Sequence, residues 1–355
     1  MKKILRYCLI LSLLTFCSLS CMDNGSYDIE EFDWSNTSPG DGLFIVNEGN
    51  FMYGNASLSY YIPSEKKVSQ EIFARANGEK LGDVAQSMVI RNGRGYITVN
   101  NSGVIFIIDI NNAYVIGTVE GLLSPRYIHF LSDTKAYVTD LYASAITVFN
   151  PKTGDITGKI DTKNQQSTEQ MVQYGKYVFT NCWSYDNKIL VIDSESDKVV
   201  DEIQVGIQPT SLIIDKYNKI WTITDGGYEG SPYGWEEPAL YRIDPETRQV
   251  EKRFLFEKND SPSEICLNGT GDTLYFINRS IWKMNVTDEQ LPQEPFLLYK
   301  GTKHYGLAVN PVNSEVYVAD AIDYVQPGII YRFSPDGKEL DFFNTGIIPG
   351  AFCFR

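Results

Sequence analysis

The sequence predicts an all-β protein, a single seven-bladed β-propeller over residues 43–355 with almost no helix. Three observations predict this fold: a strand pattern that recurs seven times, an apolar strand and polar turn after each copy, and a C-terminal segment that supplies a strand missing at the start. The chain of 355 residues is 43% hydrophobic and 13% aromatic, so it can bury the core that such a domain needs.

The recurring strand has an aromatic residue near its start and ends in Asn or Asp, as in LFIVN from residue 43 and VYVAD from residue 316. The seven aromatic residues are spaced 52, 41, 40, 44, 54 and 42 residues apart, which is the period of a four-stranded propeller blade. They are Phe44, Tyr96, Tyr137, Tyr177, Trp221, Tyr275 and Tyr317.

The other strands of each blade repeat in register. An apolar strand follows each copy and runs into a turn of Asn, Asp, Pro, Gly or Ser, residues that favour tight reversals. A more charged fourth strand, such as VEKRFLFE at 250–257, is expected at the outer edge. An innermost strand precedes six copies, and IIPGAFCFR at 347–355 matches the seventh. It is predicted to join the blade of residues 43–73 and close the ring.

Connectivity predicts which loops share a face. Loops from the second to the third strand, and from the fourth strand to the next blade, gather on one rim, which we call the top face. DGGYEGSPYGWEEPA at 225–239 belongs there, and long loops in a compact scaffold are usually functional or disordered. Their aromatic content argues against disorder, although some of these side chains are expected only to pack the loops. The candidate ligand contacts in these loops are Phe51, Tyr53, Asn55, Tyr142, Trp183, Tyr185, Tyr228, Tyr233, Trp235 and Tyr324.

The innermost strands begin at the top, so their leading residues are expected to surround the mouth of the central channel. Most of them form hydrogen bonds without carrying charge, which suits a ligand rich in amides or hydroxyls, or channel water alone. These residues are Gln86, Arg126, Gln170, Thr210, Ser263, Tyr305 and Gly350. Of these, Gln86, Arg126, Gln170 and Tyr305 are candidate ligand contacts, as is the neighbouring His304. The Asn and Asp residues that end the recurring strands are expected to cap turns instead.

Little in the sequence points to catalysis, and the protein is predicted not to be an enzyme. Only two histidines occur, His129 and His304, and no GxSxG, HExxH or Walker motif is present. No cofactor or protein-bound metal is expected, because the cysteines after Cys21 are widely spaced and form no zinc pattern. The alternative is a lyase that opens streptogramin rings, with His304 acting beside Glu48 or Asp320.

The N-terminus has the layout of a secretory signal over residues 1–20, with a basic start, a short apolar run and small residues before Cys21. Ser20–Cys21 resembles a bacterial lipobox, which predicts lipidation of Cys21 and a polar tether over residues 21–42; an ordinary signal peptide is the alternative. Loss of residues 1–20 leaves 28 basic and 45 acidic residues, a formal charge of about −17. This charge makes nucleic acid an improbable partner.

The leader, the stretch LFIVNEGNFMYGNASLSYY from residue 43 and the seven blades resemble the YncE-like propeller lipoproteins of Bacteroidetes. The resemblance covers nearly the whole mature chain and is greatest to members that capture cobalamin (vitamin B12). It implies a lipid-anchored protein of the outer membrane at the cell surface. The expected ligand is a corrinoid, and the expected partner is a TonB-dependent transporter of the BtuB type. Alternatives are a propeller enzyme and a protein-binding scaffold.

Overall fold

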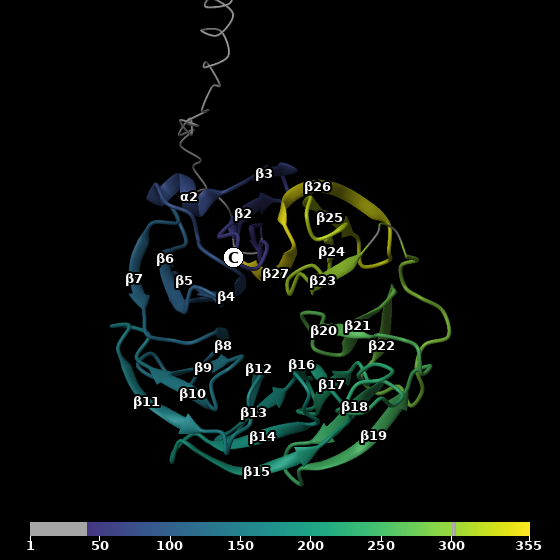
Figure 1. Ribbon diagram of the computed structural model, residues 1–355. Coiled ribbons are helices and arrows are strands. Elements are labelled where there is room, and N and C mark those ends of the chain that lie inside the picture. The colour runs from purple at the N-terminus through teal and green to yellow at the C-terminus, as the bar shows by residue number, and fades with distance from the viewer. Residues whose placement is uncertain (1–40, 300, 302) are drawn as a thin grey trace, which may run out of the picture. The chain divides into compact units, whose positions relative to one another are not determined.

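A computed structural model describes residues 41–299, 301 and 303–355, so the predicted signal peptide, Cys21 and most of the tether lie outside the described residues. Seven antiparallel sheets stand around a central axis, as the sequence predicts (Figure 1). The strands of the recurring pattern become the second strands of the blades, and β1 (Leu43–Asn47), β9 (Ala136–Asp140), β17 (Ile220–Thr224) and β24 (Val316–Asp320) are buried along their whole length.

The blades follow chain order, and the strands of each run from the innermost outward. Blade 1 has β27 (Pro349–Phe354), β1, β2 (Ser57–Ile62) and β3 (Lys67–Ser69); blade 2 has β4 (Ala85–Arg91), β5 (Arg94–Val99), β6 (Val104–Asp109) and β7 (Val115–Val119); blade 3 has β8 (Pro125–Phe130), β9, β10 (Ala145–Phe149) and β11 (Ile156–Asp161). Blade 4 has β12 (Thr168–Tyr174), β13 (Tyr177–Cys182), β14 (Lys188–Asp193) and β15 (Lys198–Gln204); blade 5 has β16 (Pro209–Ile214), β17, β18 (Ala239–Asp244) and β19 (Gln249–Leu255). Blade 6 has β20 (Ser263–Leu267), β21 (Thr273–Asn278) and β22 (Ser280–Asn285); blade 7 has β23 (His304–Val309), β24, β25 (Pro327–Phe333) and β26 (Glu339–Ile347).

The C-terminal strand closes the ring, which confirms the prediction. β27 pairs antiparallel with β1, and Phe352 lies opposite Ile45. The backbone N–H of Glu48 donates to the carbonyl of Ile348 at 2.8 Å, which extends the pairing beyond the end of β1. Blade 1 is therefore built from both ends of the domain, and neither β1 nor β27 is left as an open edge.

The core lies between neighbouring blades. Between blades 4 and 5, for example, Phe179 and Ile189 pack in one cluster with Leu212, Ile220 and Tyr241. The leading aromatic residues are part of these layers, and their polar atoms find partners, as when the Tyr96 hydroxyl donates to the Pro151 carbonyl at 3.0 Å. The layers hold each blade against the next, so the loops of the top face rest on a rigid base.

Two features depart from the regular repeat. Blade 6 has only three strands in the part of the chain that the structure describes, where a fourth was expected. The segment that follows β22 contains Pro292 and Pro295, which cannot donate to a strand ladder, and it pairs with the sheet as an isolated bridge between Ile281 and Leu297. A short helix, α2 (Ile72–Asn77), lies outside blade 1 between β3 and β4 (Figure 1). No helix among the described residues has the length and hydropathy needed to cross a membrane.

Most of the Asn and Asp residues at the ends of the second strands form structural hydrogen bonds, as expected, although Asp225 and Asn278 also line a cavity. Asn181 donates to the Pro209 carbonyl at 2.7 Å, and Asp140 accepts the backbone N–H of Ser124 at 2.8 Å and of Tyr142 at 2.9 Å. The Asn181 bond joins the end of one blade to the start of the next, whereas the Asp140 bonds hold the start of β8 and the loop after β9 together within blade 3.

Candidate functional site

A β-bulge interrupts every innermost strand near its top end. In β20, Ser263 pairs with Ile277 and Ile265 pairs with Phe276, so Glu264 is an extra residue. Bulges bend a strand and re-aim its side chains, and in this ring they bring residues into the channel that a regular strand would direct elsewhere. The residues at the other six bulges are Gln86, Arg126 with Tyr127, Glu169 with Gln170, Thr210, Tyr305 and Gly350.

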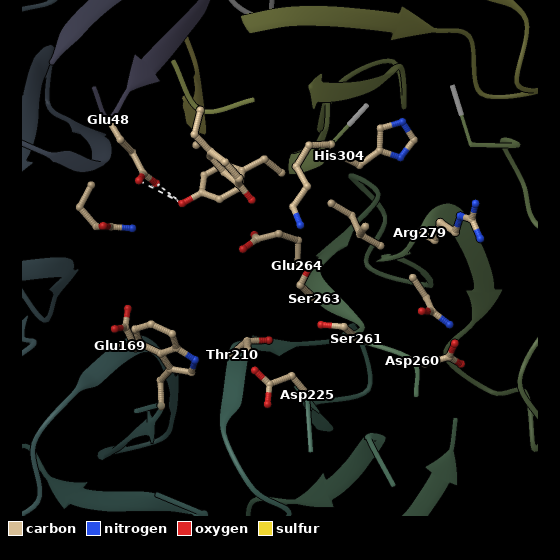
Figure 2. A pocket seen from close by; sticks show the side chains of 18 of the residues that line it. Glu48, Glu169, Thr210, Asp225, Asp260, Ser261, Ser263, Glu264, Arg279 and His304 are labelled. Atoms are coloured by element: carbon tan, nitrogen blue, oxygen red, sulfur yellow. Dashed lines mark hydrogen bonds between the residues drawn. The ribbon is translucent and has the colours of Figure 1, made fainter. Parts of the chain in front are cut away.

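A cavity of about 680 Å³ opens among these bulges at the mouth of the channel (Figure 2). Its volume is within the usual range for a small-molecule site. It is lined by Glu48, Gln86, Arg126, Tyr127, Glu169, Trp183, Thr210, Asp225, Asn259, Asp260, Ser261, Ser263, Glu264, Ile277, Asn278, Arg279, Tyr299, Lys303, His304, Tyr305, Tyr324 and Gly350.

Arg126 and Glu169 form a buried ion pair on one wall. The Arg126 Nε donates to both carboxylate oxygens of Glu169 at 2.9 Å, and its Nη1 donates to the side-chain oxygen of Gln86. The side chain of Glu169 is 3% exposed, and burial raises its pKa even though Arg126 opposes the shift. The Trp183 ring lies 5.9 Å from the Arg126 guanidinium, within the range of a cation–π contact.

Glu48 occupies the wall formed by blade 1. It follows β1 directly, and both of its carboxylate oxygens accept from the Tyr305 hydroxyl, at 3.0 and 3.1 Å. Burial raises the pKa of Glu48 to about 7, while Arg126 and the Tyr305 hydrogen bond oppose the shift. The ring of Tyr305 in turn meets Tyr324 edge to face, with centroids 5.7 Å apart. This wall therefore holds a carboxyl group that titrates near neutral pH.

The expectation of a mostly neutral channel mouth was wrong. The cavity is lined by five carboxyl groups, from Glu48, Glu169, Asp225, Asp260 and Glu264. Among the described residues, the lining includes three permanently basic side chains, those of Arg126, Arg279 and Lys303. Glu169 and Glu264 were missed because they adjoin the leading residues Gln170 and Ser263 in the chain, and a bulge that changes their direction has no signature in an alternating strand pattern.

The cavity brings together six of the predicted ligand contacts, namely Gln86, Arg126, Trp183, His304, Tyr305 and Tyr324. Two others have structural roles instead. Gln170 accepts the backbone N–H of Leu212 at 2.8 Å, and Asn55 accepts the backbone N–H of Asn50 at 2.7 Å within its own loop. Neither residue lines the cavity.

The remaining predicted aromatic residues lie outside the cavity, on top-face loops. Most of them are more than half exposed, and we call this set the aromatic rim: Phe51, Tyr53, Tyr142, Tyr185, Tyr228 and Tyr233. Tyr185 and Tyr233 come from neighbouring blades and stack with ring centroids 4.3 Å apart, which confirms that loops of different blades meet on one face. Trp235 is half-buried, and the Lys258 ammonium lies 4.2 Å from its ring.

The described residues contain no group of three or more His, Cys, Asp or Glu side chains arranged to hold a metal ion. His304 begins β23 and lines the cavity beside Tyr299, with ring centroids 5.1 Å apart. His129 is half-buried in β8, where its Nε2 lies 3.0 Å from the Gln173 side-chain oxygen. Cys182, Cys266 and Cys353 are unpaired thiols whose pKa values are raised by burial, as expected of small buried side chains.

The fold and the cavity define the class: a seven-bladed propeller with a polar cavity and an aromatic rim on its top face. The chain belongs to the family described as a domain of unknown function, DUF5074, whose model matches residues 41–341. A search of curated proteins gives no match.

Solved structures support the fold. A quinoprotein alcohol dehydrogenase-like protein from Bacteroides thetaiotaomicron has a TM-score of 0.72 at 17% identity, covering 90% of this chain and 79% of the other. Hydrazine synthase from Kuenenia stuttgartiensis has a TM-score of 0.61 at 13% identity, covering 76% of this chain and 89% of the other. Virginiamycin B lyase from Staphylococcus aureus has a TM-score of 0.56 at 14% identity, covering 76% of this chain and 88% of the other. At these identities the similarity concerns the fold alone.

Proposed function

We propose that the protein is a non-enzymatic binding lipoprotein that captures cobalamin or a related corrinoid on its top face. The observation that carries this proposal is the aromatic rim beside a hydrogen-bonding cavity on one rigid face. A corrin ring is broad and flat, with apolar faces and amide arms along its edge. Exposed tyrosine rings can pack against such faces, and the carboxyl oxygens of the cavity can accept hydrogen bonds from the amides.

The rest of the proposed role follows from the leader and the resemblance. A lipid on Cys21 would anchor the chain at the outer membrane, and the resembled lipoprotein BtuG passes cobalamin to the TonB-dependent transporter BtuB. We propose a similar transporter as the partner of this chain and the cell surface as its location. A tethered capture protein raises the local concentration of ligand at the transporter.

Calorimetric titration of the full chain with cyanocobalamin tests the proposal. Saturable binding at one site per chain is expected, and the visible spectrum of the recovered ligand should show that it is chemically unchanged. No heat of binding, and no spectral change across the titration, would contradict the corrinoid assignment.

The enzyme alternative is tested by incubating the wild type and His304→Ala with virginiamycin B and measuring ring opening. If His304 acted in turnover of a streptogramin, the wild-type chain would open the ring of virginiamycin B and this variant would not. Our proposal predicts no turnover by either chain, together with measurable binding of cyanocobalamin by the wild type. A scaffold propeller would instead bind a protein partner and neither small molecule.

A further inference from the structure

Of the five carboxyl groups that line the cavity, that of Glu264 is the one without a hydrogen-bond partner among the described residues. It is the extra residue of the β20 bulge, and its φ of 45° lies in the left-handed region that residues other than glycine rarely adopt. Its side chain is directed into the cavity (Figure 2). Within residues 41–299, 301 and 303–355, its carboxyl group makes no hydrogen bond or ion pair.

The charged neighbours of Glu264 do not compensate it. Glu48 and Glu169 line the same cavity and repel a negative charge on Glu264 (Figure 2). Arg126 attracts that charge but is already engaged by both oxygens of Glu169. Lys303 also lines the cavity, without an ion pair to Glu264. Burial and the two glutamates therefore raise the pKa of Glu264 to about 8.

Glu264 is half-buried, and an ionised carboxylate that is partly withdrawn from bulk water is stabilised by a partner, because its desolvation is otherwise uncompensated. When no ligand is bound, protonation of Glu264 near neutral pH removes the charge. A ligand that enters the mouth of the channel and offers N–H donors stabilises the ionised carboxylate directly. Hydrogen bonds to an ionised acceptor are about twice as strong as those between neutral groups. Trp183 and Tyr324 line the same cavity and can contact the apolar part of such a ligand.

We propose that Glu264 is the anchoring acceptor of this site and receives an N–H donor group of the ligand, either a primary amide or an ammonium. Glu48 and Glu169 add to the negative field around that group. The inference rests on the proposed binding role of the top face, but it does not require that the ligand be a corrinoid.

Two probes separate the two sources of the donor. Cyanocobalamin offers primary amides, whereas tryptamine offers an ammonium beside an aromatic ring, and indole-3-propionate is its anionic counterpart. Each is titrated calorimetrically into the full-length wild type, E264L, E264Q and the control E246Q. Glu246 is exposed in the turn between β18 and β19, on the rim opposite the cavity.

We expect E264L to weaken binding of the active probe at least tenfold, E246Q to leave it unchanged, and indole-3-propionate not to bind. E264Q separates the donors: it should retain most of the affinity for an amide, because its side-chain oxygen still accepts a hydrogen bond, but should weaken ammonium binding as much as E264L does. If circular dichroism shows that E264L does not fold, E264Q with tryptamine decides the ammonium case, and E264A replaces E264L for cyanocobalamin.

Equal cyanocobalamin affinity in the wild type and E264L would overturn this inference and leave the corrinoid proposal standing. If tryptamine binds in a way that depends on Glu264 and cyanocobalamin does not bind, the inference stands and the corrinoid proposal is overturned. Binding of neither probe by the wild type would overturn both.

Discussion

At the scale of single residues, the channel mouth contains buried charged side chains, whose desolvation is unfavourable. Arg126 and Glu169 are almost fully buried, and their two hydrogen bonds of 2.9 Å compensate desolvation that neither charge could bear alone. Removing one partner leaves the charge of the other buried and unpaired. The resulting loss of stability is larger than the net stability that the ion pair contributes.

The substitution Arg126→Met should therefore lower the free energy of unfolding by about 3 kcal/mol at pH 8, because Glu169 is left charged and buried. The loss should shrink at pH 5, where Glu169 can take up a proton. Urea unfolding followed by circular dichroism measures both values. The double variant R126M/E169L should recover most of the lost free energy of unfolding. The ion pair of Lys188 with Glu202, whose carboxylate side chain is 57% exposed, offers a control: Lys188→Met should have a much smaller effect, because water solvates the carboxylate that is left. A double variant no more stable than R126M would contradict this reading of the pair.

The raised pKa values of Glu48 and Glu264 make stability depend on pH. A carboxyl whose pKa is higher in the folded than in the unfolded chain holds its proton longer when folded, so the unfolding free energy falls as pH rises from the ordinary value of 4.5 through the folded values of about 7 and about 8. The double variant E48Q/E264Q should remove this fall. Its melting temperature should exceed that of wild type by roughly 3 °C or more at pH 8.5 and differ little at pH 4.5. An advantage that is the same at both pH values would show that the carboxyl groups do not titrate as described.

At the scale of elements, the closing strand and the bulges decide whether a site exists. β27 completes blade 1, and Phe352 packs against the cluster that contains Ile45 and Tyr317. The strand also carries Gly350, whose place at a bulge leaves room for Glu48: a Cβ at this position would lie 2.3 Å from the Glu48 Oε1. The same strand thus closes the ring and shapes one wall of the cavity.

Phe352→Ala should destabilise the fold by roughly 2 kcal/mol, because it removes half-buried apolar surface from the strand that closes the ring. The matched substitution Phe342→Ala, at a ring that is 60% exposed on β26, should have a much smaller effect. Comparison of the two urea midpoints checks this expectation. Equal midpoints would mean that closure by β27 contributes little to stability.

The sequence was sufficient to predict strands and their order, since the recurring aromatic residues and polar turns are local signals. It also predicted that Gln86, Arg126 and Tyr305 would reach the channel mouth, because strand direction follows from connectivity. The charge of the site could not be predicted in this way. Glu169 and Glu264 enter the cavity only because one extra residue shifts the register of β12 and β20, and a bulge depends on pairing with the neighbouring strand. That the described part of blade 6 has no fourth strand was in principle predictable from Pro292 and Pro295.

At the scale of the whole molecule, the ring gathers on one face loops that are far apart in the chain. The stacked pair Tyr185 and Tyr233 joins blades 4 and 5 and belongs to the aromatic rim, so it presents apolar surface without supporting the core. Tyr217 is a control of similar exposure, 54% against 57% for Tyr233. It lies in the turn between β16 and β17, on the opposite face.

The central claim is that the top face is the ligand-binding face, and the most direct test is titration of cyanocobalamin into the full-length double variant Y185A/Y233A and into Y217A. We predict that the double variant binds at least tenfold more weakly than wild type with an unchanged melting temperature, because stacking surface is lost from the rim alone. We predict that Y217A binds like the wild type. Wild-type affinity in Y185A/Y233A, or an equal loss in Y217A, would contradict the claim.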